Sequence, residues 1–163
     1  MTTPMETEQR DVATVERFIP APPEKIFDLL ADPDRHHDID GSGTVVKTQT
    51  GAQRLQLGSK FGMSMKMGIG YSMESTVIEF DEDRRIAWQT RPPNKVAAIF
   101  AGGRIWRYVL EPVEGGTRVT ESWDITQEQQ KWLVRPARKK TIDSMGKTLA
   151  RIEELVATPS AWR

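Results

Sequence analysis

The sequence predicts a single α+β domain in which a curved antiparallel sheet wraps around a long C-terminal helix. Segments of strand character follow one another between residues 44 and 125, and short links join them, which favours antiparallel pairing. A short helix follows the first strand, and an amphipathic helix occupies residues 142–156. A strand, a short helix, a run of strands and a final helix together indicate the α+β class.

The bulk composition is that of a globular protein. The chain has 163 residues, of which 37% are hydrophobic and 28% are charged. A domain of this length buries about 70% of its unfolded surface, which allows one substantial core. Lys plus Arg and Asp plus Glu each number 23, so no overall basic excess indicates nucleic-acid binding.

The sequence also predicts the cellular compartment. It contains no cysteine, so the fold needs no disulfide, which favours a reducing compartment. The first ten residues are polar and lack the apolar core of a signal peptide. No run approaches the ~18 apolar residues of a membrane span. We therefore expect a cytoplasmic protein without a membrane span.

The N-terminal third is expected to contain one strand and one helix. Residues 1–9 are a polar tail, and the β-branched and aromatic residues 14–19 form the first strand. Pro22 and Pro23 open a short helix, because proline is tolerated in a first helical turn. The polar, glycine-rich residues 36–43 form a loop with one helical turn.

The remaining strands come in one series. They are predicted at residues 44–50, 61–68, 71–80, 84–90, 104–110 and 117–125, which with the first makes about seven. The segment at 61–68 alternates strictly with a period of two. Glu114-Gly115-Gly116 is a favoured hairpin turn.

A helical region ends the chain. Residues 126–129, Thr-Gln-Glu-Gln, match a capping box, and Pro136 separates the first turns from the main helix. The apolar stripe of that helix comprises Ile142, Met145, Leu149, Ile152 and Val156. We expect one domain at residues 10–158, followed by a C-terminal tail at 159–163.

Several stretches resemble a known superfamily. Residues 22–33, PPEKIFDLLADP, resemble the start of START-like proteins, also called SRPBCC proteins, which have the helix-grip fold. Residues 36–44, which contain IDGSGT, residues 77–88, and residues 115–123, GGTRVTESW, are similar to the polyketide cyclase/dehydrase and lipid transport branch. The resemblance covers about residues 12–157. It implies a deep cavity between sheet and helix for apolar molecules, and it implies no single activity, since members bind, transport or cyclise.

Methionines and aromatic residues are the main candidates for lining such a cavity. Met63, Met65 and Met67 share one strand face, where flexible thioethers suit an adaptable ligand surface, although they could simply pack under the helix. On the next-to-last strand we favour Trp106, Tyr108 and Leu110 as the inward set, although ordinary core packing would also explain them. The same two interpretations apply to Trp88 and Trp123.

One carboxylate is a candidate for chemistry. Val119, Glu121 and Trp123 share a strand face, so Glu121 points inward if Val119 does. A buried carboxyl has a raised pKa and serves as an acid, a base or a ligand anchor. The alternative is an exposed cross-strand ion pair. Tyr71 and Arg107 are its candidate polar companions.

The two histidines suggest a metal only weakly. His36 and His37 lie with Asp38 and Asp40 in one loop, but adjacent side chains diverge and no third strong ligand has a recognisable spacing. We expect no metal and no cofactor, and a loop contact at the cavity mouth instead. Neither a cysteine nor a G-x-S-x-G serine offers a nucleophile.

Two further segments bear on the cavity. Gly146 lies in the last helix on the face shared by Ile142 and Leu149, where glycine costs about 1 kcal/mol relative to alanine. It either leaves room for a ligand or for the close approach of a strand, or it is a tolerated irregularity. Residues 91–103 contain an apolar run, 96–101, that could gate an opening or form a packed extra turn.

The predicted function is binding, by sequestration or transport, of an apolar small molecule such as a lipid or polyketide. The alternative is an aromatase/cyclase-type enzyme that acts by proton transfer in the same cavity, and a third hypothesis is a partner-binding module. We expect no nucleic-acid partner. The sequence is compatible with both a monomer and a homodimer. The predicted ligand-binding residues are Met63, Met65, Met67, Tyr71, Trp88, Trp106, Tyr108, Glu121, Trp123, Met145, Gly146 and Leu149.

Overall fold

One antiparallel sheet and a long C-terminal helix make up the fold. The computed structural model describes residues 10–42, 45–48, 53–67 and 69–157; the side chains at 45–48 and 63–71 lie outside this description. Within it the sheet has seven strands in the order β1-β7-β6-β5-β4-β3-β2. The strands are β1 (Val12–Ile19), β2 (Val45–Thr48), β3 (Lys60–Met67), β4 (Ile69–Asp81), β5 (Arg85–Arg91), β6 (Arg104–Val113) and β7 (Gly116–Asp124).

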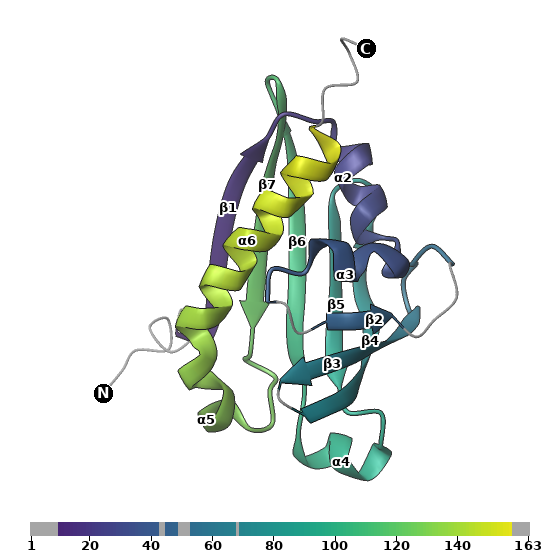
Figure 1. The fold of residues 1–163 in the computed structure, drawn as a ribbon, viewed down its shortest axis with the longest axis vertical. Coiled ribbons are helices and arrows are strands. Elements are labelled where there is room, and N and C mark those ends of the chain that lie inside the picture. Colours follow the sequence, from purple (N-terminus) through teal and green to yellow (C-terminus); the bar gives the residue numbers. More distant parts are fainter. Residues whose placement is uncertain (1–9, 43–44, 49–52, 68, 158–163) are drawn as a thin grey trace.

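Helices connect and cover these strands. They are α2 (Pro23–Leu30), η1 (Pro33–Arg35), α3 (His36–Ile39), α4 (Lys95–Phe100), α5 (Lys131–Val134), η2 (Arg135–Ala137) and α6 (Arg138–Val156). Figure 1 shows α6 lying along one face of the sheet, over β1, β7 and β6, with α2 and α3 beside it. The predicted α+β architecture, with its antiparallel sheet and long final helix, is confirmed.

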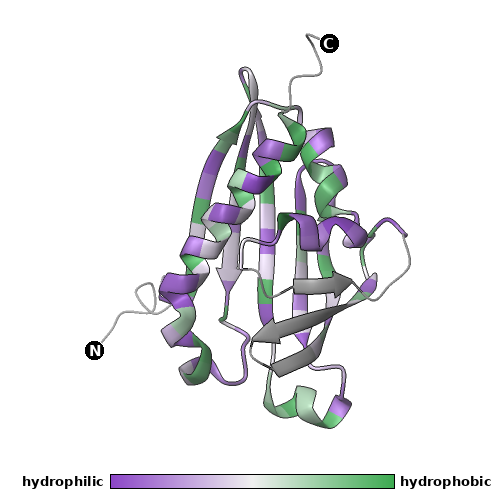
Figure 2. Cartoon of the chain, viewed as in Figure 1, coloured by the Kyte–Doolittle hydropathy of each residue, from purple (hydrophilic) through white to green (hydrophobic). Residues whose placement is uncertain are grey.

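The core lies between α6 and the face of the sheet that α6 covers. Figure 2 shows hydrophilic and hydrophobic residues alternating along α6, as expected of an amphipathic helix. The buried residues of α6 are Met145, Thr148, Leu149 and Ile152. Met145, Leu149 and Ile152 pack against buried side chains of the sheet and of α2, so burial of one helix face holds the two layers together.

The segment before α6 differs from the sequence prediction. The prediction of a capping box at residues 126–129 is wrong, because the helical region begins only at Lys131. The Oε1 of Glu128 accepts a hydrogen bond from the backbone N–H of Gly102 at 2.8 Å. Thr126 bonds to the carboxylate of Asp124 instead, through its N–H at 2.9 Å and its hydroxyl at 2.6 Å. The side chains that a capping box would use therefore have other partners: a local one for Thr126 and a distant one for Glu128.

A glycine brings α3 and α6 into close contact. The backbone N–H of Gly41 donates to the Oγ1 of Thr148 at 2.8 Å. A Cβ at Gly41 would lie 2.1 Å from the carbonyl oxygen of Ser144, whereas a Cβ at Gly146 would meet no atom within 4 Å. The Nε of Arg151 also donates to the carbonyl oxygen of Asp38, at 3.0 Å. The close approach that requires glycine is therefore at Gly41.

The two glycines should respond in opposite directions to the same substitution. Gly41→Ala forces the backbones of the loop and α6 apart, and we expect a loss of about 1–3 kcal/mol in the free energy of unfolding. Gly146→Ala adds a methyl group in open space and removes a flexible helix residue, so we expect a gain of about 0.5–1 kcal/mol. Urea unfolding measures both, and a more stable Gly41→Ala variant would contradict the packing described.

Candidate functional site

Aromatic side chains form a row across the inner face of the sheet. The strand register places Trp88 of β5 opposite Trp106 of β6, and Trp106 opposite Trp123 of β7. In the neighbouring row Tyr108 of β6 lies opposite Glu121 of β7. These cross-strand neighbours share one face because side chains alternate along each strand. The sheet thus places one carboxyl beside a wall of aromatic rings.

Glu121 is buried with only half of its carboxyl group satisfied. Its residue is 2% exposed, and the Tyr108 hydroxyl donates to its Oε1 at 2.7 Å. Its Oε2 is buried and has no hydrogen-bond partner among the described residues. Burial raises the pKa of Glu121 to about 8, the bond from Tyr108 opposes this rise, and the negative charge of Asp40 adds to it. Glu121 is therefore mainly a neutral carboxylic acid at neutral pH.

His36 is a second buried polar group on this face. Its Nε2 lies 2.8 Å from the carbonyl oxygen of Leu30, which can only accept, so Nε2 carries the proton. Its Nδ1 is then an acceptor, and it is buried without a partner. The ring stacks on Trp88, with centroids 4.9 Å apart and planes at 21°. Burial lowers the pKa of His36 below its usual range, which keeps the ring neutral.

Aromatic contacts join these polar groups into one cluster. The centroid of Trp88 lies 4.9 Å from that of His36 and 5.6 Å from that of Tyr108, and Tyr108 in turn bonds to Glu121. We call His36, Trp88, Tyr108 and Glu121 the inner cluster. It contains two unpartnered polar atoms in apolar surroundings, each of which costs about 1–3 kcal/mol. A bound molecule with suitably placed polar atoms would recover part of that cost.

Trp106 links two groups of buried apolar side chains in the core. The buried side chains form two separate groups, one around Trp88 and Leu149 and one around Trp123 and Met145. Trp106 packs against both groups and is itself only partly buried. Trp88 and Tyr108 of the inner cluster belong to the first group, and Trp106 lies between that group and the second.

The sequence profile of polyketide cyclase/dehydrase and lipid transport proteins matches residues 10–157. The chain belongs to this family. An uncharacterised protein of Mycobacterium tuberculosis, Rv0088, is 34% identical over 108 residues. That match covers 65% of this chain and 44% of the relative, so the chain spans less than half the length of the relative that it matches.

Solved structures show the same fold at low sequence identity. A protein from Arthrobacter aurescens has a TM-score of 0.70 and 14% identity, over 93% of this chain and 89% of its own. Protein NE0264 from Nitrosomonas europaea has a TM-score of 0.67 and 17% identity, over 94% and 98%. These structures thus share the fold of this chain although most side chains differ.

In this family member the sequence-predicted residues lie in three places. Seven of them lie on or beside the face between sheet and α6, namely Trp88, Trp106, Tyr108, Glu121, Trp123, Met145 and Leu149. Gly146 is at the margin of the buried face of α6. For Met63, Met65, Met67 and Tyr71 the strand backbone belongs to β3 and β4, but their side chains lie outside the described residues.

Two sequence-based expectations about Glu121 are corrected. It is not an exposed cross-strand ion pair, because the side chain is buried. Arg107 is not its companion, because its guanidinium bonds to Glu79 at 2.6 Å and to Asp124 at 3.4 Å. Residues 107 and 108 point to opposite faces of the strand, so only Tyr108 can reach Glu121.

Sequence reasoning missed the roles of Tyr108 and His36 in the inner cluster. The sequence did contain a signal for Tyr108. In a hairpin with a two-residue turn, the residues at equal distances before and after the turn lie opposite each other. With the turn at Glu114 and Gly115, this rule puts Tyr108 opposite Glu121. For His36 the local sequence contains no comparable signal. Its neighbour His37 is exposed and lies 3.1 Å from Asp38.

The described residues contain neither a metal-binding cluster nor a membrane-spanning helix. No group of three or more His, Cys, Asp or Glu side chains in this part of the chain is arranged to hold a metal ion. No helix within the same residues is long and apolar enough to span a membrane.

Stability should depend on pH through Glu121. The pKa of a glutamate carboxyl is 4.5 in an unfolded chain, and that of Glu121 is about 8 in the folded protein, so the folded state retains a proton that the unfolded state releases. The contribution of this group to stability is therefore lost as pH rises from about 4.5, and it levels off above about 8. Glu121→Gln keeps an acceptor for Tyr108 and cannot ionise. We expect it to exceed the wild type in stability by up to about 3 kcal/mol at about pH 7, and by little at about pH 5.

Urea titrations of the wild type and Glu121→Gln at about pH 5, 7 and 8.5 measure this difference. Glu114→Gln, at the exposed tip of the β6–β7 hairpin, is the matched control and should follow the wild type at each pH. Wild-type and Glu121→Gln curves that run parallel across the range would mean that Glu121 is ionised in the folded protein.

Proposed function

We propose that this chain binds an uncharged, largely apolar small molecule between the sheet and α6. The observation that carries the proposal is the carboxyl group of Glu121: it is buried, bonded on one oxygen and unpartnered on the other. A core optimised only for stability gains nothing from such a group, since an unpaired buried polar atom is destabilising. A ligand-binding role explains why it is there.

The state of Glu121 indicates which ligand atom it would meet. Because Oε1 accepts from the Tyr108 hydroxyl, the proton of the neutral acid is best placed on Oε2. Oε2 would then donate a hydrogen bond to a carbonyl or hydroxyl oxygen of the ligand. The unprotonated Nδ1 of His36 would accept a hydrogen bond from a ligand hydroxyl group.

The surroundings restrict the ligand further. Trp106 is only partly buried and lies between Trp88 and Trp123, and aromatic rings stack favourably on such flat apolar surfaces. The negative charge of Asp40 raises the pKa of both Tyr108 and Glu121, so it lies close enough to disfavour an anionic group there. These features favour a ring-containing, polyketide-like ketone or phenol over an ionised fatty acid.

A second candidate function is cyclisation of a polyketide chain by proton transfer. It is favoured by the pKa of Glu121, which at about 8 lies close to neutral pH, where acid–base catalysis is efficient. Tyr108 is a poor partner for such chemistry, since burial and the neighbouring carboxyl raise its pKa well above its usual value. Binding remains the function that the arrangement supports better.

Binding should stabilise the protein selectively. At a free ligand concentration of ~100 times the dissociation constant, linkage adds about 2.7 kcal/mol, which for a domain of this size raises the melting temperature by about 5–11 °C. We expect neutral flavonoids and polycyclic ketones to produce such shifts near neutral pH, and long-chain fatty acids to produce smaller ones. A panel in which no neutral compound shifts the melting temperature would mean that side chains fill the proposed site.

Variants of Glu121 distinguish hydrogen bonding by its carboxyl group from the hydrophobic contribution to ligand binding. Glu121→Gln still presents one acceptor and one donor, so it should bind neutral ligands and continue to do so above about pH 8, where the wild type weakens as Glu121 ionises. Glu121→Leu removes both groups, and we expect about 3–10-fold weaker binding. Glu114→Gln is the control. Equal affinity of the wild type and the Leu variant for a ketone would exclude the carboxyl as anchor.

The same variants distinguish the two functions. Incubation with polyketide-like substrates, followed by mass spectrometry, should give no product from the wild type if the chain only binds. Product formed by the wild type but not by Glu121→Gln, which retains binding and cannot transfer the proton, would establish the cyclase function instead.

A further inference from the structure

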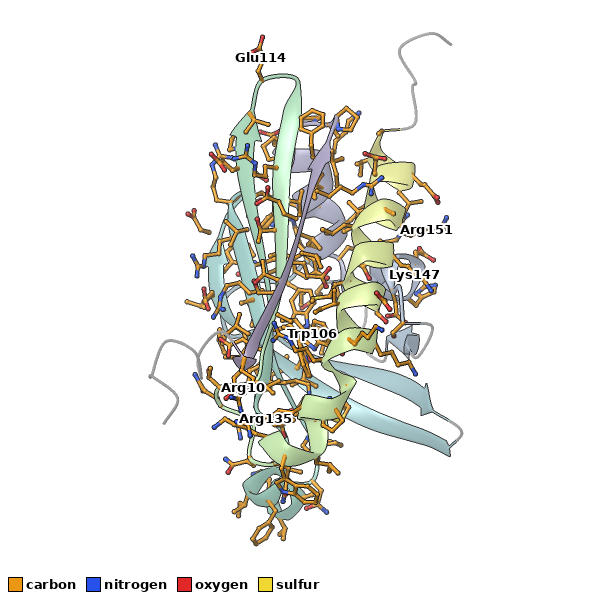
Figure 3. All side chains as sticks on the ribbon, turned by 90° about the vertical axis from the view of Figure 1, so that its left-hand side faces the viewer. Arg10, Trp106, Glu114, Arg135, Lys147 and Arg151 are labelled. Carbon is orange, nitrogen blue, oxygen red and sulfur yellow. The ribbon has the colours of Figure 1, made fainter. Side chains whose placement is uncertain are left out.

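Large apolar side chains are concentrated on the surface at one end of the molecule. Of the eight large hydrophobic residues that are exposed in the described part of the chain, five lie on α4 and α5. They are Val96 (66% exposed), Ile99 (66%), Phe100 (64%), Trp132 (70%) and Leu133 (62%). We call this surface the apolar end. Figures 1 and 3 show both helices at the end of the molecule opposite the β6–β7 hairpin, whose tip is marked by Glu114.

Hydrogen bonds join the two helical segments into one surface. The side chain of Gln130 donates from Nε2 to the carbonyl oxygen of Phe100 at 2.9 Å and accepts from the indole N–H of Trp132 at 2.9 Å. The backbone N–H of Gln129 donates to the carbonyl oxygen of Gly102 at 2.9 Å, and Gly102 donates back to Glu128. Segments about thirty residues apart in sequence are therefore held together at their polar backbones, while their apolar side chains face outward.

The two segments that carry the apolar end are rich in basic residues. Residues 91–104 and 127–140 contain eight Lys and Arg residues and one acidic residue, although the whole chain has 23 of each kind. The acidic residue is Glu128, whose side chain is 1% exposed and lies 3.3 Å from Arg104. Lys95, Lys139 and Lys140 are exposed, and Arg135 pairs with Asp11. The apolar end is thus bordered by cations.

We infer that the apolar end docks on the surface of an anionic phospholipid bilayer. Tryptophan and phenylalanine side chains bind at the boundary between headgroups and acyl chains, and aliphatic side chains beside them bury apolar area there. Each Lys or Arg close to an anionic leaflet adds electrostatic attraction. An apolar tip with a basic border therefore matches such a membrane in both respects.

Other occupants fit the same surface less well. A second copy of the chain docked through the same surface would bring two positively charged ends together. A nucleic acid would pair with the cations, but it would leave Val96, Ile99 and Leu133 without an apolar partner. The docking inference does not depend on the proposed ligand, and empty vesicles suffice to test it.

Vesicle flotation with the full chain tests the inference. We expect the wild type to float with phosphatidylcholine vesicles that contain about 30% phosphatidylglycerol, and to bind pure phosphatidylcholine vesicles at least about 10-fold less. Raising the salt concentration should weaken the binding. The double variants Phe100→Ser/Trp132→Ser and Lys139→Glu/Lys140→Glu should each lose about 10-fold or more, since each removes one of the two contributions.

Matched controls lie away from the apolar end. Phe18, 49% exposed, is next to the β6–β7 hairpin at the opposite end, and Lys25 is exposed on α2. Phe18→Ser and Lys25→Glu should bind vesicles like the wild type, and circular dichroism checks that every variant is folded. The inference is overturned if the wild type does not float, if it binds both vesicle types equally, or if the apolar-end variants bind unchanged. Sedimentation that shows a dimer dissolved by Phe100→Ser/Trp132→Ser, or a preference for RNA over vesicles, would also overturn it.

Discussion

The two-residue turn at Glu114 and Gly115 determines which residues of β6 and β7 face one another. Gly115 adopts a φ of 83°, a conformation that other residues rarely take, and this closes the hairpin without a bulge. The resulting register sets Trp106 against Trp123 and Tyr108 against Glu121. A shift by one residue would turn the carboxyl toward the outer face, so the inner cluster depends on this turn.

Burial of Glu121 costs stability, and in the proposed function the same buried carboxyl binds the ligand. The bond from Tyr108 satisfies one oxygen, and neutralisation of the acid avoids the much larger cost of a buried charge. On the outer face of the sheet, Glu79 and Arg107 form an ion pair in contact with solvent. The hydrogen bond from Arg107 lowers the pKa of Glu79, so this carboxyl is ionised. One sheet thus carries ionised pairs outside and a neutral acid inside.

The similar solved structures show that many different side chains are compatible with this fold. Structures with 14–17% identity share the architecture over nine-tenths of the chain, so helix and sheet packing tolerate extensive substitution. Function then depends on a few side chains placed on a common frame. In this chain two sets stand out, the inner cluster and the apolar end, and they lie in different parts of the molecule: one against α6 and one on α4 and α5.

The sequence by itself determined the order of the strands and of the first and last helices, the turn at Glu114 and Gly115, and the apolar face of α6, but not the helix α4 or the start of the helical region at Lys131. These features follow from short-range periodicity and from the backbone preferences of glycine and proline, which act over a few residues. It also identified Glu121 and the tryptophans as inward candidates. Only the tertiary structure decided that His36 stacks on Trp88, that Glu128 bonds to Gly102, and that Gly41 rather than Gly146 is a site of close approach. Each of these contacts joins residues 26 or more positions apart, and the burial that sets their energies exists only once distant segments have packed together.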